Sequence, residues 1–512
     1  MKICLFLLML TVIGFQMVFS QADSSIVVDQ VDNSALVYLE NAANIAISSE
    51  GKTVVAWQTA ADVSQIAVSL YDSEFGEWGA PQEISTAVFQ AMNPALAADQ
   101  SGNIYALWQQ QDDTSTYKER DALFFSKFNG TSWSAPVDVT GYDFDNGEAS
   151  INVASDGTVF IVWNTDGDDS LEAVFTKNSA DGGDTWSDAV QLSAGHAELR
   201  DQSDAGRAVL AAGSDGKMVA VWANKPNTAY AKMETFCNIY NGSSWSEPAL
   251  VSDSSRVIND RFPSVVVDSQ DSIHILIQDY ESNANRFLKM HTKAWDDAEW
   301  PAAADTIVNR GFQTSYPFMV IDANDNIHVT FRRKAQDALT VSWENAYTMS
   351  SDGGKTWTEQ NRISRYAHDA AYASIAVASD HVAAVWRETD SVATTSGPYS
   401  IPYIQLAAVT ALHDGNGNSP AIFDLQQNFP NPFNPSTHIT FSVSKTDDYT
   451  LSVYNLLGQK IKTLMIGTLQ AGKYSANWNG KNDLGRTVSS GIYFYKLSNG
   501  TEQLIKKMTF IR

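Results

Sequence analysis

The chain has 512 residues and a formal net charge of −25, from 59 Asp and Glu residues against 34 Lys and Arg. A body this acidic argues against nucleic acid or an anionic membrane as a partner. Solubility outside the cell would account for the same charge without any ligand.

The first 20 residues have the composition of a signal peptide. Lys2 supplies the positive end, residues 3–15 are apolar except for Thr11 and Gly14, and small residues precede a cleavage point before Gln21. The alternative, a membrane anchor, is disfavoured because the apolar run is short for a bilayer span. No later segment has such a run, so the sequence predicts an exported, soluble protein without a transmembrane segment.

Removal of this leader would take Cys4 with it and leave Cys237 as the only cysteine. An exported protein with a single thiol has no internal disulfide, so packing must hold the fold together. Cys237, in Glu234-Thr-Phe-Cys-Asn-Ile-Tyr240, is expected to be a buried small apolar residue. No Cys–His signature surrounds it, which disfavours a catalytic thiol.

Strand patterns from residue 21 to 410 recur with a period near 55 residues. Alternating small and apolar residues lead through a Gly/Asp/Asn turn into a strand that closes on a large residue. Seven such closing positions follow one another at spacings of 51 to 59 residues: 57, 108, 163, 222, 277, 331 and 386. A third strand, a turn and a short outer strand complete each unit, which predicts an all-β protein with four-stranded blades, a β-propeller.

Six of the units are complete, whereas the seventh lacks a fourth strand. Ser25–Val28, directly after the leader, is predicted to supply it, which would close the ring from both ends of the chain. The alternative is a propeller of six blades with one unit set aside.

A turn with the sequence Ser179-Ala-Asp-Gly-Gly-Asp-Thr-Trp186 returns as Ser350-Ser-Asp-Gly-Gly-Lys-Thr-Trp357. The glycines permit positive φ, the aspartates can accept hydrogen bonds from the turn, and the tryptophans pack where the next strand begins. This pattern resembles the Asp box of the sialidase (BNR-repeat) families, whose fold is a β-propeller. The resemblance implies a structural role, away from the ligand face, for six residues: Asp181, Gly183, Trp186, Asp352, Gly354 and Trp357.

The last part of the chain has a different charge and pattern. From residue 421 to 512 there are ten Lys and Arg against five Asp and Glu, or +5, which leaves −31 for residues 21–420. Residues 411–424 are turn-rich and are predicted to be a linker. Five strand-like runs with turns between them predict a small β-sandwich over residues 425–512.

Motifs of this region resemble the type A C-terminal sorting domain of the type IX secretion system of Bacteroidota. They are Asn428-Phe-Pro-Asn-Pro-Phe-Asn-Pro-Ser436, Trp478-Asn-Gly480 and Ser490-Gly-Ile-Tyr-Phe-Tyr495. The resemblance covers about 90 residues. It implies passage across the outer membrane guided by this domain, the secretion machinery as a partner, and a secreted or cell-surface protein.

The ligand face of such a propeller would be built by the loops after the closing positions and those entering the next unit. Units five to seven place arginines and tyrosines there, which are predicted to bind an anionic ligand group: Arg261, Arg310, Arg332, Arg365, Arg387, Tyr316 and Tyr366. Arginine suits a carboxylate because its planar fork donates two parallel hydrogen bonds. The alternative is that these arginines pair with neighbours such as Asp260, Asp369 and Glu388.

The sequence contains no complete catalytic motif. Sialidases use three arginines, a Tyr–Glu pair and an Asp, and their first arginine lies in an R-I-P motif that Arg261-Phe-Pro263 matches imperfectly. The acidic loop from Asn164 to Glu172 lacks EF-hand spacing, so no metal or cofactor is expected. The sequence thus predicts a monomeric surface module that binds glycan or protein. An exo-α-sialidase or related glycoside hydrolase, and a purely structural surface component, remain alternatives.

Overall fold

The computed structural model describes 26–31, 43–59, 63–72, 77–86, 88–112, 120–142, 145–166, 173–194, 206–224, 233–251, 259–282, 285–301, 304–307, 313–334, 343–358, 360–364, 369–378, 381–389, 399–407, 424–425, 428, 431, 433–434, 436–443, 447–469, 472–483, 486–499 and 503–511. Every regular element in these ranges is a strand. None of the described segments is a helix long and apolar enough to cross a membrane. The chain divides into two compact units, one of Ser25–Asp72 and Trp78–Ile404 and one that contains Gln405–Arg512.

The described strands of the first unit form seven antiparallel sheets, called here blades one to seven. Blade one consists of β2 (Ala43–Ile47), β3 (Thr53–Gln58), β4 (Ile66–Asp72), β5 (Glu77–Trp78) and β6 (Gln82–Glu83). Blade two consists of β7 (Ala91–Ala98), β8 (Ile104–Asp112), β9 (Arg120–Phe128) and β10 (Val137–Asp138). Blade three consists of β11 (Asp145–Val153), β12 (Val159–Asp166), β13 (Ala173–Ser179) and β14 (Val190–Gln191).

The remaining blades repeat the same order of strands. Blade four consists of β15 (Gly206–Ala212), β16 (Met218–Asn224), β17 (Glu234–Tyr240) and β18 (Ala249–Leu250). Blade five consists of β19 (Asn259–Val267), β20 (Ser272–Ser282), β21 (Asn285–Ala294) and β22 (Asp305–Thr306). Blade six consists of β23 (Thr314–Ile321), β24 (Ile327–Lys334), β25 (Trp343–Ser350) and β26 (Asn361–Arg362). Blade seven consists of β27 (Ala370–Val377), β28 (His381–Thr389), β29 (Tyr399–Ala407) and β1 (Ile26–Val31).

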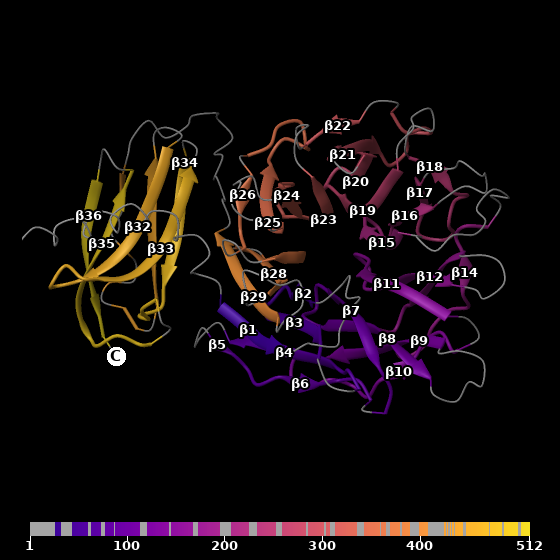
Figure 1. The fold of residues 1–512 in the computed structure, drawn as a ribbon, viewed down its shortest axis with the longest axis horizontal. Helices are drawn as coiled ribbons and strands as arrows, with labels where there is room; N and C mark the ends of the chain where they lie inside the picture. The colour runs from indigo at the N-terminus through magenta and orange to yellow at the C-terminus, as the bar shows by residue number, and fades with distance from the viewer. Residues whose placement is uncertain are drawn as a thin grey trace, which may run out of the picture. The chain divides into compact units, whose positions relative to one another are not determined.

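The first strand of each blade in chain order after β1 is its inner strand, and the inner strands form a closed ring. Each contacts the inner strand of the next blade, from β2 through β7, β11, β15, β19 and β23 to β27, and β27 contacts β2 again. Figure 1 shows the blades following one another around a common centre. This arrangement is a β-propeller, and all seven sheets take part in it.

The ring is closed by pairing between the two ends of the unit. Strand β1 pairs antiparallel with β29, with Ile26 opposite Tyr403 and Val31 opposite Tyr399. The strand predicted at Ser25–Val28 to complete the last blade is therefore confirmed and is observed as Ile26–Val31. The closure pairs the outer edge of β29 and anchors the start of the unit without a disulfide.

The hydrophobic cores lie between neighbouring blades. Trp108, for example, is fully buried in a cluster with Val54 and Val68 of blade one, and Trp222 is buried with Phe160 of blade three. Small and apolar residues alternate on the strands because one face of a blade packs against the preceding blade and the other face against the next. Each closing residue therefore stabilises a joint between two blades.

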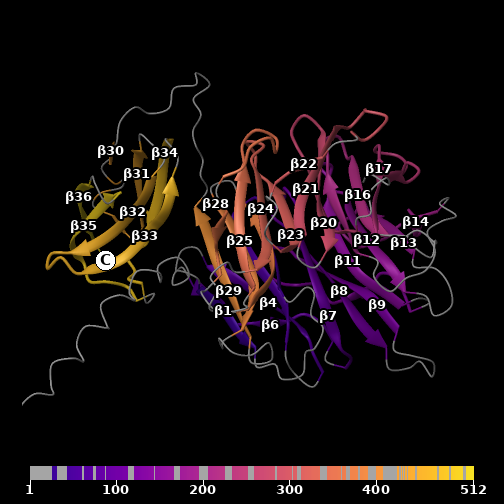
Figure 2. The ribbon, with the colours of Figure 1, turned by 45° about the horizontal axis from the view of Figure 1, so that its top comes forward.

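Residues 424–510 contain two further sheets, which form a β-sandwich (Figure 2). One has the order β30 (Asp424–Leu425), β31 (Thr437–Val443) and β34 (Gly472–Trp478). The other has the order β33 (Lys460–Leu469), β32 (Asp447–Asn455), β35 (Gly491–Ser498) and β36 (Gln503–Phe510). Phe441, Trp478, Leu451 and Tyr495 from the two sheets share one buried core. The sandwich therefore has a core that belongs to it alone.

Candidate ligand-binding site

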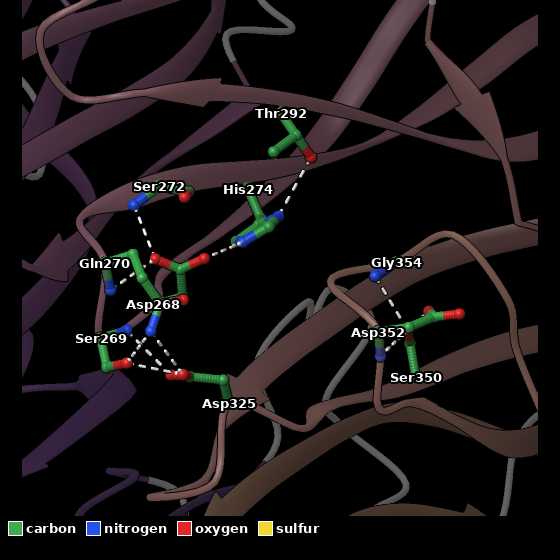
Figure 3. Close-up of polar contacts among 10 residues, drawn as sticks. All are labelled: Asp268, Ser269, Gln270, Ser272, His274, Thr292, Asp325, Ser350, Asp352 and Gly354. Atoms are coloured by element: carbon green, nitrogen blue, oxygen red, sulfur yellow. Dashed lines mark hydrogen bonds and ion pairs between the residues drawn. The ribbon is translucent and has the colours of Figure 1, made fainter. Parts of the chain in front are cut away.

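The two Asp boxes have the geometry of tight structural turns. The Gly183 N–H donates to Ser179 Oγ at 2.7 Å, and Ser179 Oγ donates to Asp181 at 2.7 Å. Asp181 also accepts from the hydroxyl and the backbone N–H of Thr185. These bonds, that of the Thr185 hydroxyl first, lower the pKa of Asp181 to about 2. Ser350, Asp352 and Gly354 repeat the arrangement (Figure 3).

The glycines of the Asp boxes permit close contact with the preceding blade. A Cβ atom at Gly183 would lie 2.1 Å from Phe125 Cε1, and one at Gly354 would lie 1.6 Å from Met290 Cε. Trp186 packs edge-on against the Phe125 ring at 5.3 Å. The Asp boxes therefore join blade three to blade two and blade six to blade five.

A second set of aspartates stabilises the turns between the first and second strands at the same end of the blades. Asp268 accepts hydrogen bonds from the backbone N–H groups of Gln270 and Ser272 and lies 3.1 Å from His274 Nε2 (Figure 3). Asp322 and His328 form the equivalent pair in blade six at 3.4 Å. Both histidines are almost fully buried, with 2% and 1% of their surface exposed. These Asp–His pairs stabilise turns through hydrogen bonds to buried histidines.

The same turns also connect neighbouring blades. The carboxylate of Asp325 in blade six accepts the backbone N–H of Ser269 at 2.8 Å and its hydroxyl at 2.6 Å (Figure 3). Asp271 in blade five accepts the same two bonds from Ser214 of blade four. This end of the ring is therefore held by aspartates whose hydrogen-bonding capacity is used within the fold.

Acid is expected to destabilise this aspartate network. Burial alone would raise the pKa of Asp322, but hydrogen bonds from His328, Asn326 and the turn backbone lower it from 3.8 to about 2. Because the pKa is lower in the folded state, the stabilisation is complete above about pH 4 and is lost as the pH falls towards 2. Because solvent partly screens this carboxylate, the shift corresponds to about 1 kcal/mol.

We therefore expect the free energy of unfolding to fall between about pH 4 and pH 2, and Asp322→Asn to remove part of that pH dependence. Denaturant unfolding of both proteins at several pH values from 2 to 7 measures this. Parallel stability curves for the two proteins would contradict a role for Asp322.

The predicted ligand residues that the structure describes lie at the opposite end of the blades. In blade six, Ile327 is paired with Ser350, where the Asp box begins, whereas Arg332 is paired with Asn345 and Ser315. Arg387 has the same place in blade seven, opposite Ala371. This end, where the second strands finish and the inner strands begin, is called here the bulge end.

The guanidinium of Arg332 is bound within the fold. It donates to both oxygens of Asp369, at 3.0 and 3.2 Å, and to the backbone oxygen of Ala370 at 3.0 Å. It also lies 4.6 Å from the centre of the Trp343 ring. Gln109, at the equivalent position in blade two, donates in the same way to Asn146 O of blade three. Arg332 thus makes the joint between blades six and seven, and its carboxylate partner is one that the ion-pair alternative named.

The inner strands contain β-bulges at the bulge end. The register shifts in six inner strands, between Met92 and Ala95 in blade two, for example, and between Ser315 and Phe318 in blade six. Four of the bulge residues have a left-handed backbone, with φ between 51° and 56°: Asn93, Phe262, Tyr316 and Tyr372. This conformation costs a bulky residue about 1 kcal/mol or more, whereas asparagine tolerates it well.

Three of these residues converge from three neighbouring blades. The ring centres of Phe262 and Tyr316 are 4.3 Å apart, and those of Tyr316 and Tyr372 are 4.6 Å apart. All three side chains are partly exposed. The Arg387 guanidinium lies 5.4 Å from the centre of the Tyr372 ring, within the range of a cation–π contact. The bulge end therefore presents partly exposed aromatic rings with a guanidinium beside one of them.

Other predicted ligand residues are placed only in part. The backbone of Arg261 lies in β19 opposite Gln278, next to the Phe262 bulge. Arg310, Arg365 and Tyr366 lie outside the described residues.

Three residues of the bulge end were not predicted from the sequence: Phe262, Tyr372 and Trp343. The sequence did contain an indication of the bulge at Phe262. Proline within a strand is confined to bulges and edges, and the residue after each of three bulge positions is a proline: Pro94, Pro263 and Pro317.

The described residues contain neither a cluster of metal-ligating side chains nor a reactive thiol. Among the described residues, no three His, Cys, Asp or Glu side chains cluster so that they could hold a metal ion. Cys237 is 1% exposed, and burial raises the pKa of its thiol to about 11. A reactive thiol needs a lowered pKa and access, so Cys237 is a core residue.

Fold and sequence together define an exported all-β protein, with a β-propeller ahead of a β-sandwich. Residues 427–511 match the family described as Secretion system C-terminal sorting domain. The sandwich is thus a type IX sorting domain, and the protein is secreted or displayed on the cell surface. No curated protein sequence matches the chain.

Solved structures resemble the chain in fold. An ulvan lyase of polysaccharide lyase family PL25, bound to -[GlcA(1-4)Rha3S]-, has a TM-score of 0.52 at 14% identity over 74% of this chain and 96% of that one. A Dyadobacter fermentans protein of unknown function has 0.47 at 12% identity over 62% and 95%. The Trypanosoma rangeli sialidase in complex with the inhibitor DANA has 0.42 at 10% identity over 92% and 84%. At these identities the likeness concerns the fold.

Proposed function

We propose that this protein is a type IX-exported β-propeller that binds an acidic glycan at the bulge end of blades five to seven. The observation that carries the proposal is the contact between Arg387 and Tyr372, which sets a cation beside a partly exposed aromatic ring. Arginine binds carboxylates through paired hydrogen bonds, and aromatic rings with a few polar groups are typical of ligand sites.

The rest of the domain favours selective binding of such a ligand. Residues 21–420 carry a charge of −31, which repels anions in general and leaves a local cation to act at short range. Arg310, Arg365 and Arg261 remain predicted contributors. Arg332, through its bonds to Asp369 and Ala370, holds the neighbouring strand in place.

Binding to a panel of acidic and neutral oligosaccharides tests the proposal. Sialyl- and glucuronate-containing sugars should bind the full-length protein, and lactose should not. Arg387→Ala should weaken binding by about tenfold, the loss of one charge-assisted contact. Arg486→Ala, which removes an exposed arginine from the sorting domain, is the matched control and should bind unchanged.

The same panel distinguishes the alternatives. Release of fluorophore from sialosides would favour a glycoside hydrolase over a binding module. Equal binding of acidic and neutral sugars, or an unchanged affinity of Arg387→Ala, would contradict the proposed site.

A further inference from the structure

Aromatic residues at the bulges are not needed by the fold. In blade two the same left-handed position is taken by Asn93, whereas Gly147 in the bulge of blade three is not left-handed. A bulge therefore forms with asparagine, which tolerates the left-handed backbone at lower cost, or with a residue that does not adopt that backbone. Blades five, six and seven nevertheless carry Phe262, Tyr316 and Tyr372. Backbone strain concentrated in three consecutive blades motivates a functional explanation.

The three rings do not belong to the cores between blades. Core aromatic residues such as Trp57, Trp108 and Trp386 are fully buried, and the core clusters contain none of the three bulge aromatics. Phe262, Tyr316 and Tyr372 are instead partly exposed and contact one another across blade boundaries. Their interplanar angles of 50° and 63° produce a faceted surface rather than one flat stack.

This surface suits a sugar ring. The face of an aromatic ring carries partial negative charge and attracts C–H groups, which a pyranose presents on its apolar face. The hydroxyl and carboxylate groups at the edge of the same sugar need donors, and Arg387 lies beside Tyr372 to supply them. A flat aromatic ligand such as a nucleobase would favour parallel rings, and nucleic acid is opposed by the acidic charge.

We propose that Phe262, Tyr316 and Tyr372 form a stacking platform for an acidic pyranose, with the carboxylate of the sugar held at Arg387. This inference rests on the proposed function and adds the residues that bind the sugar ring and the reason for their strained backbone. It predicts that affinity and stability respond in opposite directions to a change at the platform.

Tyr316→Asn and Tyr372→Asn test this directly, because asparagine relieves the strain as Asn93 does. The probes are 3′-sialyllactose and a glucuronate–rhamnose disaccharide, the latter taken from the sugar in the ulvan lyase complex, and affinity is measured by calorimetric titration of the full chain. Each variant should bind the preferred probe about tenfold or more weakly, while its Tm stays equal to or above that of the parent. Tyr316→Phe, which keeps the ring, should bind within about twofold of the parent.

The contrary outcomes are distinct. If the parent binds an acidic probe and both asparagine variants bind it equally well, the platform is wrong and the proposed function stands. If the variants lose several degrees of Tm along with binding, the rings are core residues and the platform is also wrong. If neither probe binds the parent, the proposed function itself fails.

Discussion

Gly183→Ala is expected to lower the free energy of unfolding by about 3 kcal/mol, far more than the same change at Gly157. At Gly183 the new Cβ would lie 2.1 and 2.4 Å from two atoms of the Phe125 ring. That ring is 3% exposed and is held between Tyr105 and Trp186, so it cannot move away. The left-handed backbone, with φ at 100°, adds to the cost.

Gly157 is the matched control because it separates backbone strain from steric contact. Its φ is 88°, yet nothing lies within 4 Å of a Cβ placed there, so Gly157→Ala should cost only about 1 kcal/mol. Gly354→Ala should fall between the two, because its contact is with the flexible end of Met290. Denaturant unfolding of the three variants measures the order. Equal losses at Gly183 and Gly157 would show that the Asp box does not lock blade three onto blade two.

Removal of the sorting domain is expected to abolish delivery to the cell surface. A chain that ends after Pro420 keeps the pairing of β1 with β29 and all the cores between blades, whereas the sandwich core around Trp478 and Tyr495 is lost as a whole. The truncated propeller should therefore fold but remain in the periplasm of a host with a type IX system. Protease accessibility on intact cells, with the full chain as control, measures this. Surface exposure of the truncated protein would contradict the role of the domain.

Much of the propeller was predictable because the same residue types recur at equivalent positions in each repeat. The closing residues Trp57, Trp108 and Trp163 recur at a near-constant spacing because each packs in the equivalent joint with the preceding blade. The missing fourth strand of blade seven pointed to β1, since without it the outer edge of the long strand β29 would stay unpaired. Local pattern and fold agree at these positions.

The candidate site was less predictable because tertiary contacts decide it. Arg332 was predicted to bind an anionic ligand, but Asp369, 37 residues later in the chain, is its partner, and no local pattern marks such a pair. The convergence of Phe262, Tyr316 and Tyr372 depends on a left-handed bulge in each of three inner strands. The prolines after Phe262 and Tyr316 indicate a bulge at those two positions, whereas Ala373 after Tyr372 gives no such indication.

The central claim, an acidic sugar bound at the bulge end, is tested most directly by where a sugar binds. Crystals of the propeller soaked in the glucuronate–rhamnose disaccharide or 3′-sialyllactose would locate it. The account predicts a sugar ring stacked on Tyr316 and Tyr372, with its carboxylate within hydrogen-bond distance of Arg387. A sugar bound instead at the Asp-box end, beside Asp268 or Asp352, would contradict it.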